Sequence, residues 1–404
     1  MVQQAVAGGL RVKGVGAGHS FTAVACTDGV QVDLSACRRV LAVDREARQV
    51  TVEAGITLAD LNIELDRLGL ALANLGDIAY QSVAGAAATA THGTGIRLGN
   101  LSTQIVGLHL IDGHGELVSC SSQVRSEVWS AARTSLGALG LITAATLQCV
   151  PAFDLHAVEE PAPVDEVLEQ LDELVDGSDH YEFFWVPGTR WAMTKRNRRT
   201  AEPARRRGRW QEIRNDLLID NVGFGAVLAV GRRRPDLIPA LAKRLPSTGR
   251  QDYIDASYRV FASARWVRFL EMEYAIPRPA FPSAFAEMRE LVRRLRVPIG
   301  FPVECRFVAG DDIALSTAYG RETAYVAVHV PIGLPHDQYF KGVEAIMDRH
   351  DGRPHWGKLH FQSAASLAPR YPRWDDFQQV RAALDPRGTF TNPELDRVLG
   401  PPAS

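Results

Sequence analysis

The sequence predicts an α+β fold in two successive parts, and three observations support this prediction. Short runs that alternate in polarity or contain β-branched residues recur through residues 1–150, bounded by turn residues. Few helical patterns interrupt these runs, so the steady alternation typical of a parallel α/β sheet is missing. Pro151 marks a change in composition, after which charged amphipathic helices alternate with strands.

The first part of the chain consists mainly of strands. Strands are expected at residues 10–15, 29–34, 40–44, 49–53, 106–111, 117–120 and 142–150. Thr57 is expected to cap a helix because Asp60 follows three residues later, and Gly69 ends that helix. Ser126 opens a second helix. We therefore take residues 1–150 as one domain.

The second part combines amphipathic helices with strands. Helices are expected at residues 164–174, 237–245 and 283–296, and strands at 181–186, 303–308 and 324–330. Residues 375–400 are expected to form a helix followed by a segment rich in Pro and Gly. The second domain is accordingly placed at 151–404, and its tail, residues 375–404, is expected to return to the first domain.

Composition and charge exclude several classes of protein. The 404 residues are 46% hydrophobic and 23% charged, which is typical of a globular protein rather than a disordered or fibrous one. The formal net charge is -2, whereas a chain that binds nucleic acid is usually strongly basic. The arginine-rich segments at Lys195–Arg199, Arg205–Arg209 and Arg232–Arg234 are therefore interpreted as solvated surface, and no nucleic-acid partner is expected.

The apolar and cysteine content indicates a cytoplasmic protein. No apolar run approaches the ~18 residues needed to span a bilayer, and the N-terminus lacks the basic and apolar regions of a signal peptide. The five cysteines are widely spaced and form no Cys-x-x-Cys motif. We therefore expect reduced thiols, no disulfide framework and no metal site.

Segments of very small residues are the candidates for ligand binding. Residues 14–20, Gly-Val-Gly-Ala-Gly-His-Ser, can approach a ligand closely and can direct backbone N–H groups at phosphate oxygens. This segment is not a G-x-G-x-x-G fingerprint, because its sixth position is His19 and no helix pattern follows. Residues 81–95 contain no bulky side chain except Gln81 and His92, which predicts a loop that forms a wall against a large flat ligand. Residues 135–143 add further glycines.

These segments, together with later motifs, resemble a known family. Residues 1–150 resemble the FAD-binding domain of the vanillyl-alcohol-oxidase type, also called the PCMH fold. The segments Pro302–Phe307, Ser316–Arg321, Pro354–His360 and Asp385–Asn392 resemble the sugar-1,4-lactone oxidases, which include L-gulonolactone oxidase/dehydrogenase, D-arabinono-1,4-lactone oxidase and alditol oxidase. The resemblance covers nearly the whole chain. It implies a PCMH-type FAD-binding domain followed by a D-arabinono-1,4-lactone oxidase-type substrate (cap) domain.

The resemblance implies FAD as the cofactor and indicates which residues bind it. The matching positions are Gly14, Val15, Gly16, Ala17, Gly18, His19, Ser20, Ser82, Gly85, Thr91, His92, Gly93, Thr94 and Ile142. His19 stands where several members bond the flavin 8α-methyl group through an imidazole nitrogen, so covalent FAD is expected. Members usually carry roughly 20 to 40 further residues before this loop, about one βα unit. Only Gln3–Gly9 match its end, so we expect an N-terminally shortened FAD domain, arising either from a truncated start assignment or from a genuinely shorter domain.

Four residues are the catalytic candidates. Glu304 and Arg306 stand two apart on a predicted strand and therefore project from one face. Such a pair can hold a polyhydroxylated lactone by charge-assisted hydrogen bonds, and Arg306 can stabilise negative charge on the flavin. His329 ends an alternating run that begins at Tyr325, and Lys358 matches the family's active-site lysine. Either could accept the hydroxyl proton of the substrate.

The resemblance implies an oxidoreductase that transfers hydride from a CH–OH group of an aldono-1,4-lactone, of the L-gulono or D-arabinono type, to flavin N5. The alternatives are an alditol oxidase and an inactive truncated flavoprotein. Pro331 replaces a threonine of the polyol oxidases, which favours the lactone. The expected electron acceptor is oxygen or a redox carrier. No transmembrane segment is expected, and peripheral membrane association stays open.

Overall fold

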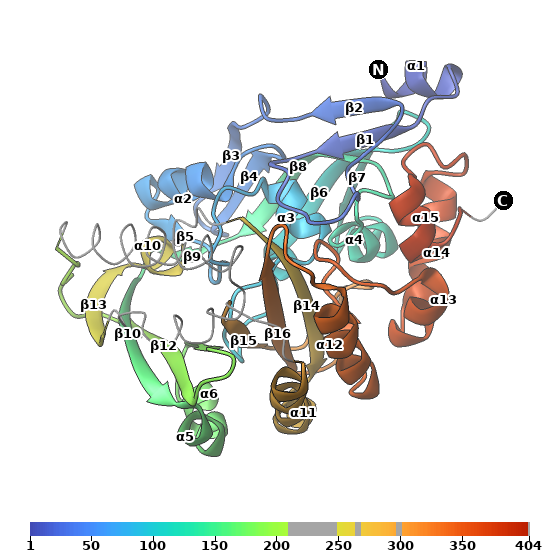
Figure 1. Cartoon of the computed structure of the whole chain (residues 1–404). Helices are drawn as coiled ribbons and strands as arrows, with labels where there is room; N and C mark the ends of the chain where they lie inside the picture. The colour runs from blue at the N-terminus through green and yellow to red at the C-terminus, as the bar shows by residue number, and fades with distance from the viewer. Residues whose placement is uncertain (209–248, 263–267, 296–300, 403–404) are drawn as a thin grey trace.

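The computed structural model describes residues 1–208, 249–262, 268–295 and 301–402 (Figure 1). Two antiparallel sheets of five and eight strands, each packed with helices, confirm the predicted α+β class. The helix expected at 237–245 and the arginines at 232–234 lie outside the described residues.

The five-stranded sheet organises the first part of the chain. Its strand order is β3 (Val40–Asp44), β4 (Gln49–Glu53), β8 (Leu141–Gln148), β6 (Ile105–Ile111) and β7 (Leu117–Ser121), with every pair antiparallel. Smaller elements complete this part, namely α1 (Val2–Ala7), a parallel ribbon of β1 (Val12–Val15) and β2 (Val30–Asp33), η1 (Leu101–Gln104), and the pair β5 (Leu70–Ala71) and β9 (Val150–Pro151).

The two helices expected in this part are present. In α2 (Leu58–Arg67), the Thr57 hydroxyl accepts a hydrogen bond from the Asp60 N–H at 3.1 Å, as the capping pattern predicts. The second helix is α4 (Ser126–Ala132).

The small-residue segment at 81–95 differs from the expected loop, because its first half forms helix α3 (Val83–Ala88). Ser82 caps this helix, and its hydroxyl accepts a hydrogen bond from the Gly85 N–H at 3.2 Å. Alanine is the strongest helix former, so a serine cap followed by several alanines outweighs the lack of bulky side chains.

The eight-stranded sheet organises the second part. Its order is β13 (Gln251–Ala256), β10 (Asp154–Pro163), β12 (Trp191–Thr200), β11 (His180–Trp185), β15 (Val303–Val308), β16 (Thr323–Pro331), β14 (Phe269–Pro277) and β17 (Arg353–Pro354). All its pairs are antiparallel. The sequence analysis did not predict β10, β12, β13 or β14. The second half of β12 carries Lys195, Arg196, Arg198 and Arg199, so the strand lacks the apolar content of its neighbours.

The two faces of this sheet have opposite character. Helices α5 (Val164–Glu169), α6 (Leu171–Asp176), α11 (Phe281–Arg294) and α12 (Asp337–Arg349) pack on one face around an aromatic-rich core. The helix expected at 164–174 is thus divided at Gln170. Side chains alternate along a strand, so every second residue of β14, β15 and β16 points to the opposite face. On that face lie the polar and charged residues described below.

The C-terminal tail packs with the first part of the chain. Its elements are α13 (Ala364–Leu367), η5 (Ala368–Arg370), α14 (Trp374–Leu384) and α15 (Pro393–Leu399), coloured red in Figure 1 beside α4. Their buried residues, among them Phe377 and Leu395, belong to the same hydrophobic core as the five-stranded sheet. The segment expected to be irregular after α14 contains α15, because Asn392 caps it by accepting from the Leu395 N–H at 2.8 Å. The remaining short helices are α10 (Ser257–Phe261) and η4 (Arg278–Ala280).

Arginines around β12 pair with carboxylates of neighbouring strands. Arg196 lies 2.8 Å from Glu160, and Arg205 lies 2.7 Å from Asp252. These pairs neutralise part of the arginine-rich surface in the described residues. None of the helices in the described ranges is both long and apolar enough to cross a bilayer.

Lys13 joins β1, the loop at 135–141 and the tail. It is 1% exposed, and its Nζ donates to the backbone carbonyls of Leu136, Gly137 and Phe390 at 3.2, 3.3 and 3.2 Å. Burial, with the nearby Arg381, lowers the pKa of Lys13 to about 7, although Asp385 opposes this shift.

We expect this lysine to make stability depend on pH. Between pH 7 and 10.5 the unfolded chain binds more protons at Lys13 than the folded chain does, so the free energy of unfolding rises with pH in this window. The gain of wild type relative to Lys13→Met is expected to approach about 1.4 kcal/mol per pH unit. Denaturant unfolding of both proteins at pH 7, 8 and 9 measures it. Parallel stability curves would contradict the assignment.

Candidate active site

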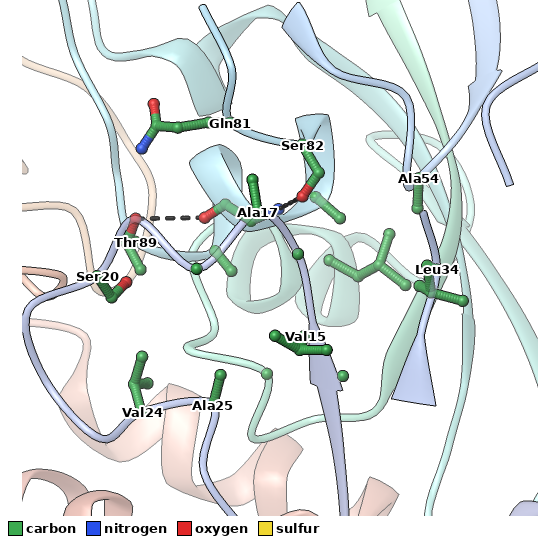
Figure 2. Close-up of a pocket in the computed structure, with 18 of the residues that line it drawn as sticks. Val15, Ala17, Ser20, Val24, Ala25, Leu34, Ala54, Gln81, Ser82 and Thr89 are labelled. Carbon is green, nitrogen blue, oxygen red and sulfur yellow. Dashed lines mark hydrogen bonds between the residues drawn. The ribbon is translucent and has the colours of Figure 1, made fainter. Parts of the chain in front are cut away.

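A cavity of about 300 Å³ lies between the β1 loop, the start of α3 and the start of β8 (Figure 2). Figure 2 shows Ala17 close to Ser82, with Ala54 and Leu34 on another side of the cavity. The predicted cofactor residues that line it are Gly14, Val15, Gly16, Ala17, Gly18, His19, Ser20, Ser82, Gly85 and Ile142. The structure thus brings both small-residue segments to one cavity, and Gly137 and Gly140 of the third segment line it too.

The chemistry of this cavity fits a phosphate-containing cofactor. The backbone N–H groups of Ala17 to Ser20 have no acceptor within the described part of the chain. Gly18 has φ of +70°, a conformation that side-chain-bearing residues rarely adopt and that turns successive N–H groups toward one side. Free backbone donors beside small apolar side chains suit a dinucleotide whose pyrophosphate needs donors and whose rings need flat apolar walls.

A second cavity, of about 670 Å³, adjoins the first. Ala17 to Ser20, Gln81 and Thr89 line both cavities, so His19 lies where they meet. All four predicted catalytic residues line the second cavity, as do Thr91 and His92. Asp77, Glu271, Glu273 and His355 also line it, and the sequence analysis had selected none of these four as a site residue.

Arg306 stands among three carboxylates. It is paired with Glu304, as expected from their shared strand face, and lies 2.8 Å from Glu182 and 3.4 Å from Asp77. Arg306 and Glu304 are 7% and 6% exposed. Burial opposes the charge of the guanidinium, but Glu304, Glu182 and Asp77 outweigh it and hold the pKa of Arg306 well above its ordinary value. The cation is therefore permanent.

Glu271 links the other two candidates. Its carboxylate is paired with the Lys358 Nζ and lies 3.5 Å from the His329 Nε2. Burial alone would raise the pKa of Glu271, but Lys358 and His329 lower it to about 2. Burial likewise disfavours the ammonium, yet Glu271 and Glu273 raise the pKa of Lys358. Lys358 therefore stays charged.

The hydrogen bonds of His329 define its tautomer. Its Nδ1 lies 3.2 Å from the carbonyl oxygen of Pro302, which can only accept, so Nδ1 must carry a proton. In the neutral ring the lone pair is then on Nε2, which faces Glu271 on the cavity side. A proton taken up at Nε2 would be stabilised by the neighbouring Glu271 carboxylate.

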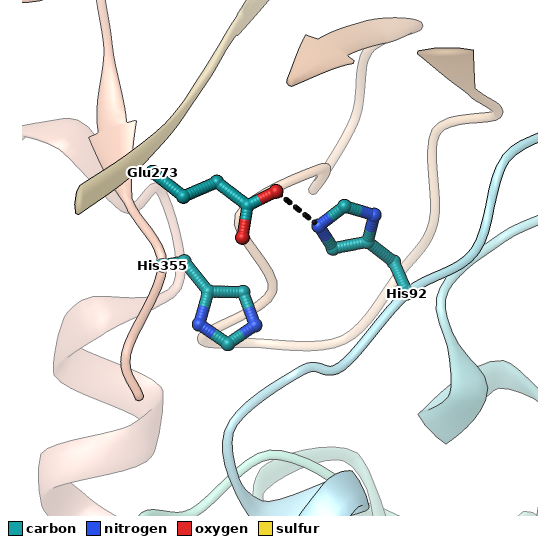
Figure 3. Close-up of side chains that lie close together, drawn as sticks. All are labelled: His92, Glu273 and His355. Carbon is teal, nitrogen blue, oxygen red and sulfur yellow. Dashed lines mark hydrogen bonds and ion pairs between the residues drawn. The ribbon is translucent and has the colours of Figure 1, made fainter. Parts of the chain in front are cut away.

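His92, Glu273 and His355 form a buried cluster whose ligand atoms lie within 4.8 Å of one another (Figure 3). The His92 Nδ1 lies 2.9 Å from the Gly93 carbonyl and its Nε2 lies 3.1 Å from Glu273, so both ring nitrogens face acceptors and a proton must lie between the ring and Glu273. The His355 Nδ1 accepts from the Gly357 N–H at 3.1 Å, so the neutral ring has no lone pair left for a metal. The cluster therefore favours a shared proton over a metal ion.

Gly93 and Thr94 are exceptions among the predicted cofactor residues, because they line neither cavity. The Thr94 hydroxyl donates to the Tyr181 carbonyl and accepts from the Phe307 N–H at 3.2 Å. A Cβ on Gly93 would lie 2.2 Å from the Leu75 carbonyl oxygen. Thr94 is thus held between β11 and β15, and Gly93 lies against Leu75 and Asn74.

Glu182, Glu271 and Glu273 contribute to the site although sequence reasoning missed them. Glu271 and Glu273 stand two apart in a strand whose intervening residues, Met272 and Tyr274, are buried in the core. The same alternation surrounds Glu182, between Tyr181 and Phe183. A glutamate at alternate positions of an otherwise apolar strand was thus the available signal.

Comparison with known proteins defines the class and then the family. A family model described as FAD binding domain matches residues 1–121. This match agrees with the free backbone N–H donors of the first cavity, which suit a phosphate-containing cofactor. Fold and site thus define an FAD-binding oxidoreductase with a PCMH-type fold. The chain belongs to the family of FAD-dependent sugar-lactone oxidases and dehydrogenases described as D-arabinono-1,4-lactone oxidase, which matches residues 145–398.

Similar proteins span almost the full chain. L-gulono-1,4-lactone dehydrogenase of Mycobacterium tuberculosis is 47% identical over 402 residues, covering 99% of this chain and 93% of the relative. L-gulonolactone oxidase of Bos taurus is 36% identical, covering 96% and 90%. Alditol oxidase of a Streptomyces species is 32% identical, covering 95% and 89%. The solved structure of cholesterol oxidase from Brevibacterium sterolicum has a TM-score of 0.83 at 19% identity, covering 98% and 91%, and shows the shared fold.

Proposed function

We propose that this protein is an FAD-dependent enzyme that oxidises a CH–OH group of an aldono-1,4-lactone. The observation that carries the proposal is the junction of the two cavities at His19, with buried acidic and basic side chains lining only the second one. The names of the relatives, above all the L-gulono-1,4-lactone dehydrogenase, support the lactone as substrate. Residues 1–150 would hold FAD, and residues 151–374 would supply most of the charged side chains of the substrate wall.

The proton of the substrate hydroxyl goes to His329 in this proposal. FAD, when bound, supplies a hydride acceptor. Lys358 cannot take the proton because its ammonium is already held by Glu271. When its ring is neutral, His329 presents the Nε2 lone pair to the cavity, and Glu271 would stabilise the imidazolium that forms on proton uptake. The Lys358 ammonium attracts the negative charge that develops on the substrate oxygen.

Glu304 and Arg306 orient the sugar ring. Carboxylate oxygens accept hydrogen bonds from ring hydroxyls, and the guanidinium donates to substrate oxygens. The fixed positive charge of Arg306 would stabilise the negative charge that a bound flavin gains when the substrate carbon loses hydride. For a 1,4-lactone oxidised next to its carbonyl, the 2-keto product would tautomerise to an ene-diol.

We further propose that FAD is bonded through His19. Burial and the nearby Lys358 ammonium lower the pKa of His19, which keeps an unprotonated imidazole available. After denaturation in acid, yellow colour and an added FAD mass are expected to stay with the protein, and His19→Ala is expected to release all flavin. Free FAD in the supernatant of the wild type would reject the bond and leave FAD binding intact.

The test of the function is anaerobic bleaching of the bound flavin by lactones and alditols. Aldono-1,4-lactones are expected to reduce the flavin fastest. Bleaching by open-chain alditols alone would instead support the activity named for the Streptomyces relative. A flavoprotein that no lactone bleaches would reject the proposal. Reoxidation of the reduced enzyme by oxygen, or only by an artificial dye, tells which class of electron acceptor it uses.

A further inference from the structure

His355 carries an uncommitted hydrogen-bond donor in the second cavity. Because its Nδ1 accepts from the Gly357 N–H, the proton of the neutral ring is on Nε2. The Nε2 atom has no hydrogen-bond partner within the described residues, and it is not completely enclosed by protein atoms. Burial lowers the pKa of His355 to about 3, so the ring stays neutral and Nε2–H stays a donor at any assay pH. Figure 3 shows the ring near Glu273 and His92.

The paired charged residues and His329 in the cavity wall have a different hydrogen-bonding character. Asp77, Glu271, Glu273 and Glu304 line it as carboxylates, which only accept hydrogen bonds once ionised. The cationic donors Lys358 and Arg306 are paired with these acidic groups. The Nδ1–H of His329 is directed at the Pro302 carbonyl, which leaves its Nε2 as an acceptor.

This distribution matches the polar groups of a lactone. Its ring hydroxyls can donate to the carboxylates, whereas its carbonyl oxygen only accepts and needs a neutral donor that is free. An alditol has hydroxyls alone and no acceptor-only group. We propose that His355 Nε2–H donates to the lactone carbonyl and thereby selects a lactone over the corresponding polyol. This proposal rests on the proposed function and deepens it.

The experiment compares two ligands that differ only at the carbonyl. One is an aldono-1,4-lactone, and the other is the 1,4-anhydroalditol with the same ring hydroxyls and a CH₂ in place of C=O. With the FAD-loaded enzyme, the dissociation constant of the lactone comes from saturation of the anaerobic flavin reduction rate. That of the anhydroalditol comes from competition against the lactone. Wild type is expected to bind the lactone about tenfold more tightly.

Two variants separate the donor from the loop contact. In His355→Asn the amide oxygen can still accept from the Gly357 N–H, but no donor reaches the Nε2 position. In His355→Gln the longer amide can place an N–H there. The first variant is expected to lose about tenfold in lactone affinity and to bind the anhydroalditol within threefold of wild type. The second is expected to recover part of the preference. His360→Asn, a buried histidine that lines neither cavity, is the control and should leave both constants unchanged.

Several results would overturn the inference. Equal weakening of both ligands by His355→Asn, or a changed flavin absorption spectrum in that variant without ligand, would show that His355 does not serve the carbonyl. Equal affinity of wild type for both ligands would do the same, even if the variants fold poorly. Failure of the proposed function looks different, because the wild-type flavin would then not be bleached by any lactone.

Discussion

Replacing His329 with asparagine is expected to slow anaerobic flavin reduction by an aldono-1,4-lactone by a factor of about 10² to 10⁴. The amide can still donate to the Pro302 carbonyl, so the strand and the cavity should keep their shape. What is lost is the lone pair at Nε2 that we assign as the proton acceptor. Stopped-flow absorbance at the flavin band gives the limiting rate, and its dependence on lactone concentration gives the dissociation constant, which should change little.

The control for this prediction is His336→Asn. His336 is partly exposed before α12 and lines neither cavity, so its replacement should leave the reduction rate unchanged. Lys358→Met provides a second comparison. It should also slow reduction, since the substrate oxygen loses a neighbouring cation, and flavin should stay bound. A His329→Asn variant that reduces flavin at the wild-type rate would return the role of proton acceptor to another group.

Replacing Arg306 with methionine is expected to be the most destabilising single change at the site. The substitution leaves Glu304, Glu182 and Asp77 without the cation that compensates them, and Glu304 and Glu182 are themselves buried. Removing one partner of a buried ion pair typically lowers the free energy of unfolding by about 3–5 kcal/mol. Thermal and denaturant unfolding of the FAD-loaded protein measure the loss, and lactone-dependent flavin reduction should also be lost.

Arg278→Met is a matched control for that loss. Arg278 also pairs with three carboxylates, Asp172, Asp176 and Glu322, but their side chains are 87%, 57% and 58% exposed. Water solvates them when the cation is removed, so we expect at most about 1 kcal/mol. Equal destabilisation by both substitutions would show that burial of the carboxylates is not the cause. Arg306→Lys should keep more stability than the methionine variant and still lose lactone affinity, because an ammonium cannot reproduce the planar donor fork.

Much of the fold could be predicted because it follows from local patterns. The strands at 40–44, 49–53 and 303–308 have the predicted bounds, since alternation and turn residues define a strand within a few positions. The loop predicted at 83–88 was wrong, because a serine cap and helix-forming alanines were given less weight than side-chain size. The strand at 191–200 was missed because its second half carries arginines, whose strand conformation is stabilised by neighbours in β10 and β11.

Some features of the site could likewise be predicted from local sequence, whereas others depend on the tertiary structure. Both small-residue segments could be selected from sequence, since glycine and alanine runs permit close approach of a ligand whatever surrounds them. The position of His19 between two cavities could not be predicted from the sequence, because strands hundreds of positions away help to build the second cavity. Thr94 belongs to the same segment as His92 but contacts β11 and β15, and only the placement of those strands shows this.

The sequence by itself determined the class of protein, the two small-residue segments that line the first cavity, and the shared face of Glu304 and Arg306, because each depends on residues that are close along the chain. The tertiary structure alone decided the protonation of the histidines and the partners of the charges. The Pro302 carbonyl holds the proton of the neutral His329 ring on Nδ1, which leaves Nε2 as a hydrogen-bond acceptor. The Gly357 N–H occupies the Nδ1 lone pair of His355, which leaves the proton of the neutral ring on Nε2 as a donor. The physical reason is that a proton's position on an imidazole depends on which group lies within about 3 Å of each nitrogen, and packing of distant strands sets that neighbour.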